Sequence, residues 1–528
     1  MESRRPVFFP AAFGILPALS LYAENWRLAS PVEGFVCVVL ALLLALAFWG
    51  LNHLWMRDAI KSGLATLLFV LLFYSYGAIH RHVFDTGDPE TTGGHTTLLW
   101  IYALLLVLGT SALARLRRDL RRAALVLDVA AVAALAGPLL ISLYSIASHY
   151  GQEGGSGPGQ DVAAAAPQRP PDIYYVVVDG YARADTLERL FDFDNRPFLE
   201  ALESRGFHVA RESYSNYNQT YLSVASSLNY TYLHELEALG PLAGSPSRAR
   251  KPLRTLIGHS RARRALAKIG YRFVTFPSGY SATRMPEPDI LIEGGWAPSE
   301  LQNTLLAKTP VPGLMLTLLD RDQYHWHRQR ILNVLENLHG LAGKLDTPIF
   351  VFAHLYSPHP PFVFDADGNP TSSGRPFLTS DGNHFFRDGG QLDEYLVGYP
   401  AQVEFLNRRL LAAFDSILER SATPPVILLQ SDHGSGLGMD HESLEGTDLE
   451  ERYGILNALH IPAAGSLDDD LSPVNSFRVV FNAYFDAGLP LASNRSFHAR
   501  WRAPYQWVEV TQELGATSRH AAAPVAAP

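Results

Sequence analysis

Long apolar runs crowd the first part of the chain and give way to mixed polar and apolar sequence after about residue 150. Five runs have the length and polarity of bilayer-spanning helices. They cover Phe8–Ala23, Val32–Trp55, Leu64–Ile79, Thr97–Leu113 and Ala123–Ser148. The pattern predicts a transmembrane domain of about five helices over residues 1–150.

The first run has a second interpretation, because Arg4 and Arg5 precede it as in a cleaved signal peptide. The four later runs favour an uncleaved anchor. Asp128 lies inside the fifth run. Acidic residues inside a membrane often serve a function, and an interfacial position near the helix end is the alternative.

Loop charges predict the orientation, because Lys and Arg are retained on the cytoplasmic side. The expected inner segments are basic and the expected outer loop is acidic. The basic residues are Arg4, Arg5, Arg57, Lys61, Arg115, Arg117, Arg118, Arg121 and Arg122, and the acidic ones are Asp85, Asp88 and Glu90. Five spans then place the N-terminus inside a bacterial inner membrane and the remaining chain on the periplasmic or extracellular side.

Composition divides the rest of the chain. Residues 151–171 carry Gly-Gly-Ser-Gly-Pro-Gly, an alanine run and a proline pair, which is typical of a flexible linker. Residues 172–514 read as a globular domain. Residues 515–528, rich in Ala and Pro, are expected to form a disordered tail.

Three apolar segments after the linker read as buried strands: one beginning at Ile173, then Ile349–Leu355 and Val426–Gln430. Helical periodicities lie between them, for example from Val403 to Ile417. Alternating strands and helices predict an α/β domain with a mostly parallel central sheet.

Candidate chemistry follows two of these strands. Asp179 ends the first, and Asp432 and His433 follow the third. Ligands of parallel sheets bind where the carboxyl ends of strands meet, so we expect these three side chains to converge. Two carboxylates and an imidazole suit a divalent cation.

A nucleophile is expected as the missing fourth ligand. Thr220 follows the polar segment Asn216–Gln219 and opens a predicted helix. A helix N-terminus favours bound phosphate, and contact with a metal lowers the pKa of a hydroxyl. A simple helix cap is the alternative role for Thr220, and on this segment alone it is the favoured one.

Charge and cysteine content exclude other classes. The net charge is −9, and no Lys/Arg block interleaved with aromatic residues indicates nucleic-acid binding. The one cysteine, Cys37, lies in an apolar run, so the chain can form neither an internal disulfide nor a multi-thiolate metal site.

Taken together, these motifs resemble the sulfatase-like branch of the alkaline phosphatase superfamily. The resemblance rests on Val-Val-Val-Asp-Gly ending at Gly180, Thr220 at a helix start, Ser-Pro-His-Pro-Pro-Phe around His359, and Ser-Asp-His-Gly around His433. The chain looks closest to membrane-bound members such as lipoteichoic acid synthases and phosphoethanolamine transferases, which also carry five N-terminal spans.

The resemblance implies an alkaline phosphatase-like fold in which Asp179, Thr220, Asp432 and His433 bind one divalent metal. Zinc or manganese is expected, with calcium or magnesium as alternatives. Thr220 would attack phosphorus to give a covalent phospho-threonine. In those synthases the first metal ligand looks like a glutamate, whereas this chain has Asp179, so the resemblance does not specify which headgroup is transferred. Sulfatases use a Cys/Ser-x-Pro-x-Arg motif, which is absent near Thr220.

Further residues are candidates for substrate contact. His359 is the preferred acid or phosphate ligand, while His354 would bind substrate or be a satisfied core histidine. His441 could reach phosphate or be a loop residue. Arg452 could clamp a phosphate oxygen or pair with Glu450 at the surface. No Asp-x-x-x-His pattern indicates a second metal.

These expectations favour a membrane-anchored transferase that moves a phospho-headgroup from a membrane lipid onto a lipid or lipid-linked glycan. A phosphodiesterase or sulfuric ester hydrolase with water as acceptor is the first alternative. A non-catalytic membrane receptor is the second.

Overall fold

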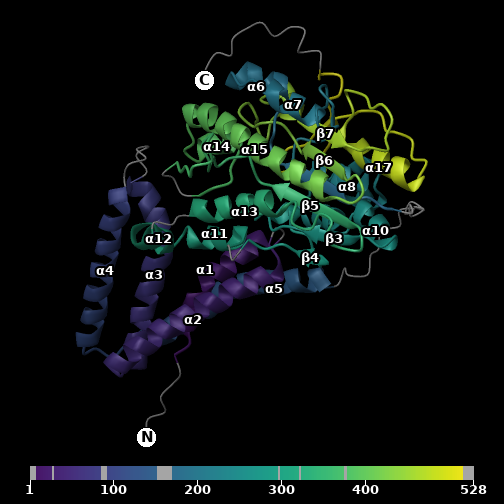
Figure 1. The fold of residues 1–528 in the computed structure, drawn as a ribbon. Helices are drawn as coiled ribbons and strands as arrows, with labels where there is room; N and C mark the ends of the chain where they lie inside the picture. Colours follow the sequence, from purple (N-terminus) through teal and green to yellow (C-terminus); the bar gives the residue numbers. More distant parts are fainter. Residues whose placement is uncertain are drawn as a thin grey trace. The chain divides into compact units, whose positions relative to one another are not determined.

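The computed structural model describes residues 7–26, 29–84, 92–150, 169–294, 298–319, 323–373 and 377–514. Its contacts divide the chain into two compact units (Figure 1). One holds residues 1–156 together with 298–326 and 374–377, and the other holds the remaining chain. Most of the predicted linker, the tail and the loop of Asp85, Asp88 and Glu90 lie outside the described residues.

The first unit contains five N-terminal helices. They are α1 (Phe9–Asn25), α2 (Pro31–Met56), α3 (Ala59–Phe84), α4 (Thr92–Arg115) and α5 (Arg121–Tyr150). Among the described residues, four segments are long and apolar enough to cross a membrane: Pro31–Met56, Ala59–His80, His95–Arg115 and Arg121–Ala147. The prediction of long apolar N-terminal helices able to span a membrane is confirmed for four segments, and the count of five spans is not.

The first predicted span is the one that falls short. Helix α1 has 17 residues, or about 25 Å of rise against an apolar bilayer thickness of about 30 Å. It packs against α2, α3 and α5, and Phe9 and Ala12 on it are buried. Asp128 of α5 accepts hydrogen bonds from the backbone N–H groups of Phe8 and Phe9, at 3.0 and 2.7 Å. Asp128 therefore caps the start of α1.

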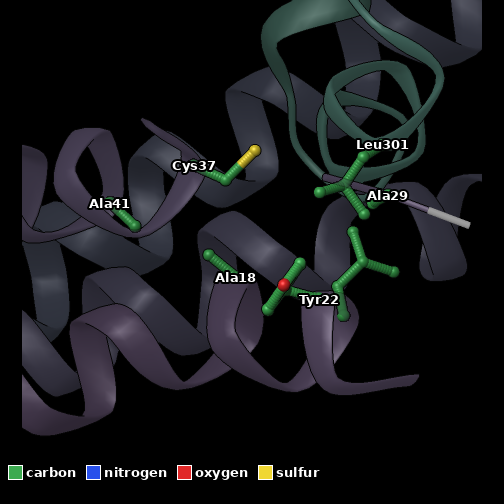
Figure 2. Packing of buried hydrophobic residues seen from close by; sticks show 7 residues of the cluster. Ala18, Tyr22, Ala29, Cys37, Ala41 and Leu301 are labelled. Atoms are coloured by element: carbon green, nitrogen blue, oxygen red, sulfur yellow. The ribbon is translucent and has the colours of Figure 1, made fainter. Parts of the chain in front are cut away.

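Two short helices far along the chain also belong to this unit, α11 (Glu300–Leu306) and α12 (Val311–Leu319). Helix α11 packs against α1 and α2, and α12 packs against α4. Figure 2 shows Leu301 of α11 beside Tyr22 and Ala29 in one buried apolar cluster. Cys37 of α2 lies in the same cluster as a buried free thiol.

The second unit is built on a seven-stranded sheet of order β2-β7-β6-β1-β5-β3-β4. Strand β1 pairs in parallel with β5 and β6, and β3 is parallel to β4 and β5, whereas β7 and β2 join antiparallel. The strands are β1 (Ile173–Val178), β2 (His208–Val209), β3 (Arg272–Thr275), β4 (Ile290–Leu291), β5 (Ile349–Leu355), β6 (Val426–Ser431) and β7 (Asn457–His460). The predicted α/β domain with a mostly parallel sheet is confirmed.

Helices enclose this sheet, so every residue of β1, β5 and β6 is buried. In one group α15 packs on α6 and α7, and in another α8 packs on α9, α10 and α17. The remaining α-helices, in chain order, are α6 (Ala184–Phe191), α7 (Arg196–Glu203), α8 (Thr220–Asn229), α9 (Lys251–Gly258), α10 (Arg261–Lys268), α13 (Gln323–Asn337), α14 (Asn383–Arg387), α15 (Leu392–Arg420), α16 (Leu449–Tyr453) and α17 (Ser476–Phe485). A small ribbon of β8 (Phe497–His498) and β9 (Val508–Glu509) follows.

Candidate metal and phosphoryl-transfer site

The strand register brings Asp179 and Asp432 together. Val178, the last residue of β1, lies opposite Ser431, the last residue of β6, so the residue after each strand emerges at the same edge of the sheet. Gly180 has a φ of +74°, a left-handed conformation that glycine adopts without strain. Its N–H donates to Oδ1 of Asp432 at 3.1 Å, which joins the two strand ends.

Asp179, Asp432 and His433 form a buried group whose ligand atoms lie within 4.8 Å of one another. Both carboxylate oxygens of Asp179 and Oδ2 of Asp432 lack a hydrogen-bond donor among the described residues. Burial, and then the charge of Asp432, raise the pKa of Asp179 well above its usual value. Three buried carboxylate oxygens without donors are costly alone, and a divalent cation would satisfy them.

The imidazole ring of His433 is oriented toward these two carboxylates. Its Nδ1 lies 2.9 Å from the carbonyl oxygen of Gly434, which can only accept, so Nδ1 carries the proton. The bare Nε2 then lies 3.3 Å from Oδ2 of Asp432 and 3.6 Å from Oδ1 of Asp179. Burial lowers the pKa of His433 to about 4. A neutral imidazole aimed at two carboxylates fits a shared metal.

Thr220 faces the same group from the start of α8. Gln219, with extended backbone angles, occupies the N-cap position, and Thr220 is the first helical residue. The Thr220 hydroxyl lies 3.4 Å from Nε2 of His433, and its side chain is buried. The capping role considered for Thr220 is therefore not the one that the structure gives it.

His354 approaches Asp179 and Asp432 from β5. It lies on β5 opposite Val177 of β1. Its Nδ1 is 2.8 Å from the Thr283 hydroxyl and its Nε2 is 3.1 Å from Oδ2 of Asp179. Burial lowers the pKa of His354 to about 4. His354 is thus a core histidine by burial, and it also contacts a candidate metal ligand.

The other three candidates meet at a residue that the sequence did not indicate, Asp381. Its carboxylate lies 3.1 Å from Nη1 of Arg452 and 3.9 Å from Nε2 of His359. His441 places Nε2 3.0 Å from the carbonyl oxygen of Asp381, and the Tyr395 hydroxyl donates to Asp381 Oδ1 at 2.9 Å. No motif surrounds Asp381, so only the fold could reveal it.

Charge explains why Asp381 stays ionised in a dry environment. Burial alone would raise the pKa of Asp381, but the positive charges of His359 and Arg452 hold it well below its usual value. Burial, with Arg452 as the second cause, lowers the pKa of His441 to about 4. The arrangement pairs one anionic carboxylate with the guanidinium beside the candidate metal group.

Arg452 connects the two halves of the site. Its Nε and Nη2 donate to the carbonyl oxygen of Asn218 at 3.0 and 2.9 Å, while Nη1 reaches Asp381. The surface pair with Glu450 is not formed: Arg452 is 3% exposed, and Glu450 lies 3.6 Å from Arg183 instead. Arg452 therefore holds the segment before Thr220 against the loop after His433.

Comparisons with known proteins give structural similarity only. No family model matches the chain, and no curated protein matches its sequence significantly. The chain is similar to the integral membrane lipooligosaccharide phosphoethanolamine transferase A of Neisseria meningitidis, at 12% identity over 90% of this chain and 95% of that one, with a TM-score of 0.36.

Two further matches cover about two thirds of this chain. The C-terminal periplasmic domain of EptC from Escherichia coli is 12% identical over 66% of this chain and 94% of that chain, with a TM-score of 0.39. The lipoteichoic acid synthase LtaP of Listeria monocytogenes is 13% identical over 64% and 81%, with a TM-score of 0.35. These are the two enzyme classes that the sequence motifs resemble. At these identities and TM-scores, the functional proposals rest on the residues of the site.

Proposed function

We propose that this chain is a membrane-anchored, metal-dependent phosphotransferase that moves a phospho-headgroup from a membrane lipid onto a second lipid or a lipid-linked glycan. The observation that carries the proposal is the meeting of the Thr220 hydroxyl with His433 and two buried carboxylates, three of whose four oxygens lack a donor among the described residues. A receptor needs no hydroxyl at such a place, whereas group transfer needs a nucleophile there.

Asp179, Asp432 and His433, together with the Thr220 hydroxyl, would hold one divalent cation, zinc or manganese by ligand type. The cation would supply positive charge that lowers the pKa of a bound hydroxyl and neutralises phosphate oxygens. The start of α8 adds its backbone N–H groups and dipole on the same side of the site. A phosphodiester fits this set of charges.

In the proposed reaction, the Thr220 hydroxyl first gives its proton to water, and its Oγ1 then forms a bond to phosphorus as the bond from phosphorus to the lipid oxygen breaks. The lipid oxygen takes a proton, for which His359 is the proposed donor, because its Nδ1 faces the carbonyl oxygen of Pro360 at 2.6 Å and leaves Nε2 toward Asp381. An acceptor hydroxyl then attacks the phosphorus and gives its proton to His359, while the bond from phosphorus to Oγ1 breaks and restores the deprotonated Thr220.

Loop charges support a catalytic unit on the outer side of the membrane. Arg57 and Lys61 lie between α2 and α3, and five arginines lie between Arg115 and Arg122 at the turn from α4 to α5. If both turns are cytoplasmic, α5 ends outside. This inference needs only the four candidate spans and holds whichever way α1 lies.

The test uses the full chain in lipid nanodiscs with manganese or zinc and a headgroup-labelled phospholipid. We expect diacylglycerol release and a labelled adduct, both lowered at least about a thousandfold by Thr220→Ala. Thr255→Ala, an exposed threonine of α9, is the matched control and should change nothing. Mass spectrometry of the Thr220 peptide should find the phospho-headgroup.

The products separate the alternatives. Free phospho-headgroup without an adduct would indicate a hydrolase with water as acceptor. If no phospholipid loses its headgroup while soluble esters are cleaved well, the lipid assignment is wrong. Full biological activity of Thr220→Ala in cells would point to a receptor.

A further inference from the structure

A buried arginine outside the metal group has a guanidinium nitrogen without an acceptor. Arg250 precedes α9 and is 3% exposed. Its Nη2 donates to the carbonyl oxygen of Trp501 at 2.6 Å and to Oε1 of Gln219 at 3.3 Å. Its Nη1 finds no acceptor among the described residues, and no carboxylate there forms an ion pair with it.

Aromatic rings hold this guanidinium in place. Arg250 lies over the ring of Trp501 at 4.6 Å and over the ring of Tyr221 at 5.5 Å. Such contacts recover part of the cost of burying a cation. They do not replace a counter-charge, because an unpaired buried charge is among the most costly groups in a protein. Burial accordingly lowers the pKa of Arg250.

The position of Arg250 places it beside the candidate nucleophile. Gln219 and Tyr221, its two contacts on the α8 side, flank Thr220 directly in the chain. The Gln219 amide is fixed from its other end, because Nε2 donates to the carbonyl oxygen of Ala499 at 2.7 Å. Arg250 is therefore attached to the segment that presents the Thr220 hydroxyl.

Other contacts of Arg250 connect it to His441 and His354, two candidates for substrate contact. The backbone N–H of Trp501 donates to the carbonyl oxygen of His441 at 2.7 Å, and the two rings meet edge to face at 5.8 Å. On the Tyr221 side, Tyr280 packs at 5.7 Å and lies 6.3 Å from the His354 ring. Arg250 thus contacts residues that neighbour Thr220 and His441, while none of the proposed chemical steps uses it.

We propose that Arg250 binds a second anionic group, a phosphate or a carboxylate, on the molecule whose phosphorus Thr220 attacks. A guanidinium presents its N–H groups in a planar fork that suits such oxygens. Trp501 and Tyr221 fix the fork before the substrate arrives, so little side-chain entropy is lost on binding. This inference rests on the proposed function and selects donors that carry an anion beside the reacting phosphodiester.

The test measures binding, so it needs no turnover. Two ligands are titrated by calorimetry into the full-length Thr220→Ala protein with manganese: ethyl phosphate and 2-carboxyethyl phosphate. They differ by one carboxylate. We expect the carboxylated ligand to bind about 10- to 100-fold more tightly, as a charge-assisted contact to a buried guanidinium would give.

Variants of the arginine decide the outcome. Adding Arg250→Met should bring the two dissociation constants to within about twofold, with binding of ethyl phosphate retained as proof of an intact site. Arg250→Lys should keep part of the preference. Arg248→Met, an exposed arginine two residues away, is the matched control and should keep all of it.

Two results would overturn the proposal: no preference when Arg250 is present, or a preference that survives Arg250→Met. Equal weakening of both ligands would make Arg250 a structural support only, and also contradicts it. A clear preference in a protein that transfers no headgroup from any lipid would leave this subsite standing and refute the proposed function instead.

Discussion

Replacing Asp179 by asparagine should stabilise the metal-free protein and abolish its stabilisation by metal. The side chain is fully buried and neither oxygen has a donor among the described residues. Asparagine has nearly the same shape and removes one of two carboxylates that lie close together. An uncompensated buried charge destabilises the folded state, so replacing it by a neutral group of similar shape removes that cost.

The magnitude follows from the geometry. Ligand atoms of Asp179 and Asp432 lie at most 4.8 Å apart, and two unit charges at that separation repel by about 3 kcal/mol at an effective dielectric constant of about 20. Because burial and the charge of Asp432 raise the pKa of Asp179, the repulsion grows as the pH rises. At pH 8 we expect a gain of about 1 to 3 kcal/mol, or roughly 2 to 4 °C in melting temperature.

With metal present, the wild type should become the more stable of the two proteins. A cation at about one hundred times its dissociation constant stabilises the wild type by about 2.7 kcal/mol. The asparagine side chain in Asp179→Asn offers one ligand fewer and no charge, so the variant should gain little. The assay is thermal unfolding in detergent, followed by tryptophan fluorescence at one heating rate, with chelator and with manganese or zinc.

Asp381→Asn provides a matched control of opposite sign. Asp381 is also a buried aspartate, but it pairs with Arg452 at 3.1 Å. Its loss should destabilise the protein by about 3 kcal/mol or more and leave the metal-induced shift in place. A lower melting temperature of Asp179→Asn in chelator, or a metal shift equal to that of the wild type, would refute this account of the site.

Three further predictions concern other parts of the chain. Gly434→Ala should lower the free energy of unfolding by about 1 to 3 kcal/mol, because a Cβ would collide with the carbonyl oxygen of Glu451. Gly465→Ala has open space around its Cβ and should leave the thermal unfolding unchanged; equal effects of the two substitutions would contradict this. Asp128→Ala should destabilise the first unit by about 1 kcal/mol, because α1 loses its cap. Asp128→Asn should retain most of the stability in the same thermal unfolding experiment in detergent. Burial, and then Arg452, lower the pKa of His441 from 6.5 to about 4, so the folded state binds fewer protons than the unfolded state and stability is lost as the pH falls through this window. In His441→Asn, the free energy of unfolding should depend less on pH between 6.5 and 4. An unchanged slope would show that His441 does not cause the pH dependence.

The sequence alone determined the parts of this protein that depend on local pattern. Continuous apolar runs predicted the membrane helices, because a bilayer requires long uninterrupted segments. The strands ending before Asp179 and Asp432 could be predicted equally well, because a strand that is buried on both faces has a continuous apolar sequence instead of alternating polar and apolar residues. Parallel pairing then made it possible to expect that the residues after those strands would meet.

Tertiary structure decided what depends on packing between distant segments. Helix α1 is apolar enough for a span, yet it is short and buried, and its capping residue Asp128 lies more than one hundred positions away in the chain. Thr220 could have been a helix cap until the fold placed His433 beside it. Asp381 and Arg250 carry no motif at all. Their importance comes from burial and from partners brought together across the chain, and a buried charge can be recognised only once its surroundings are known.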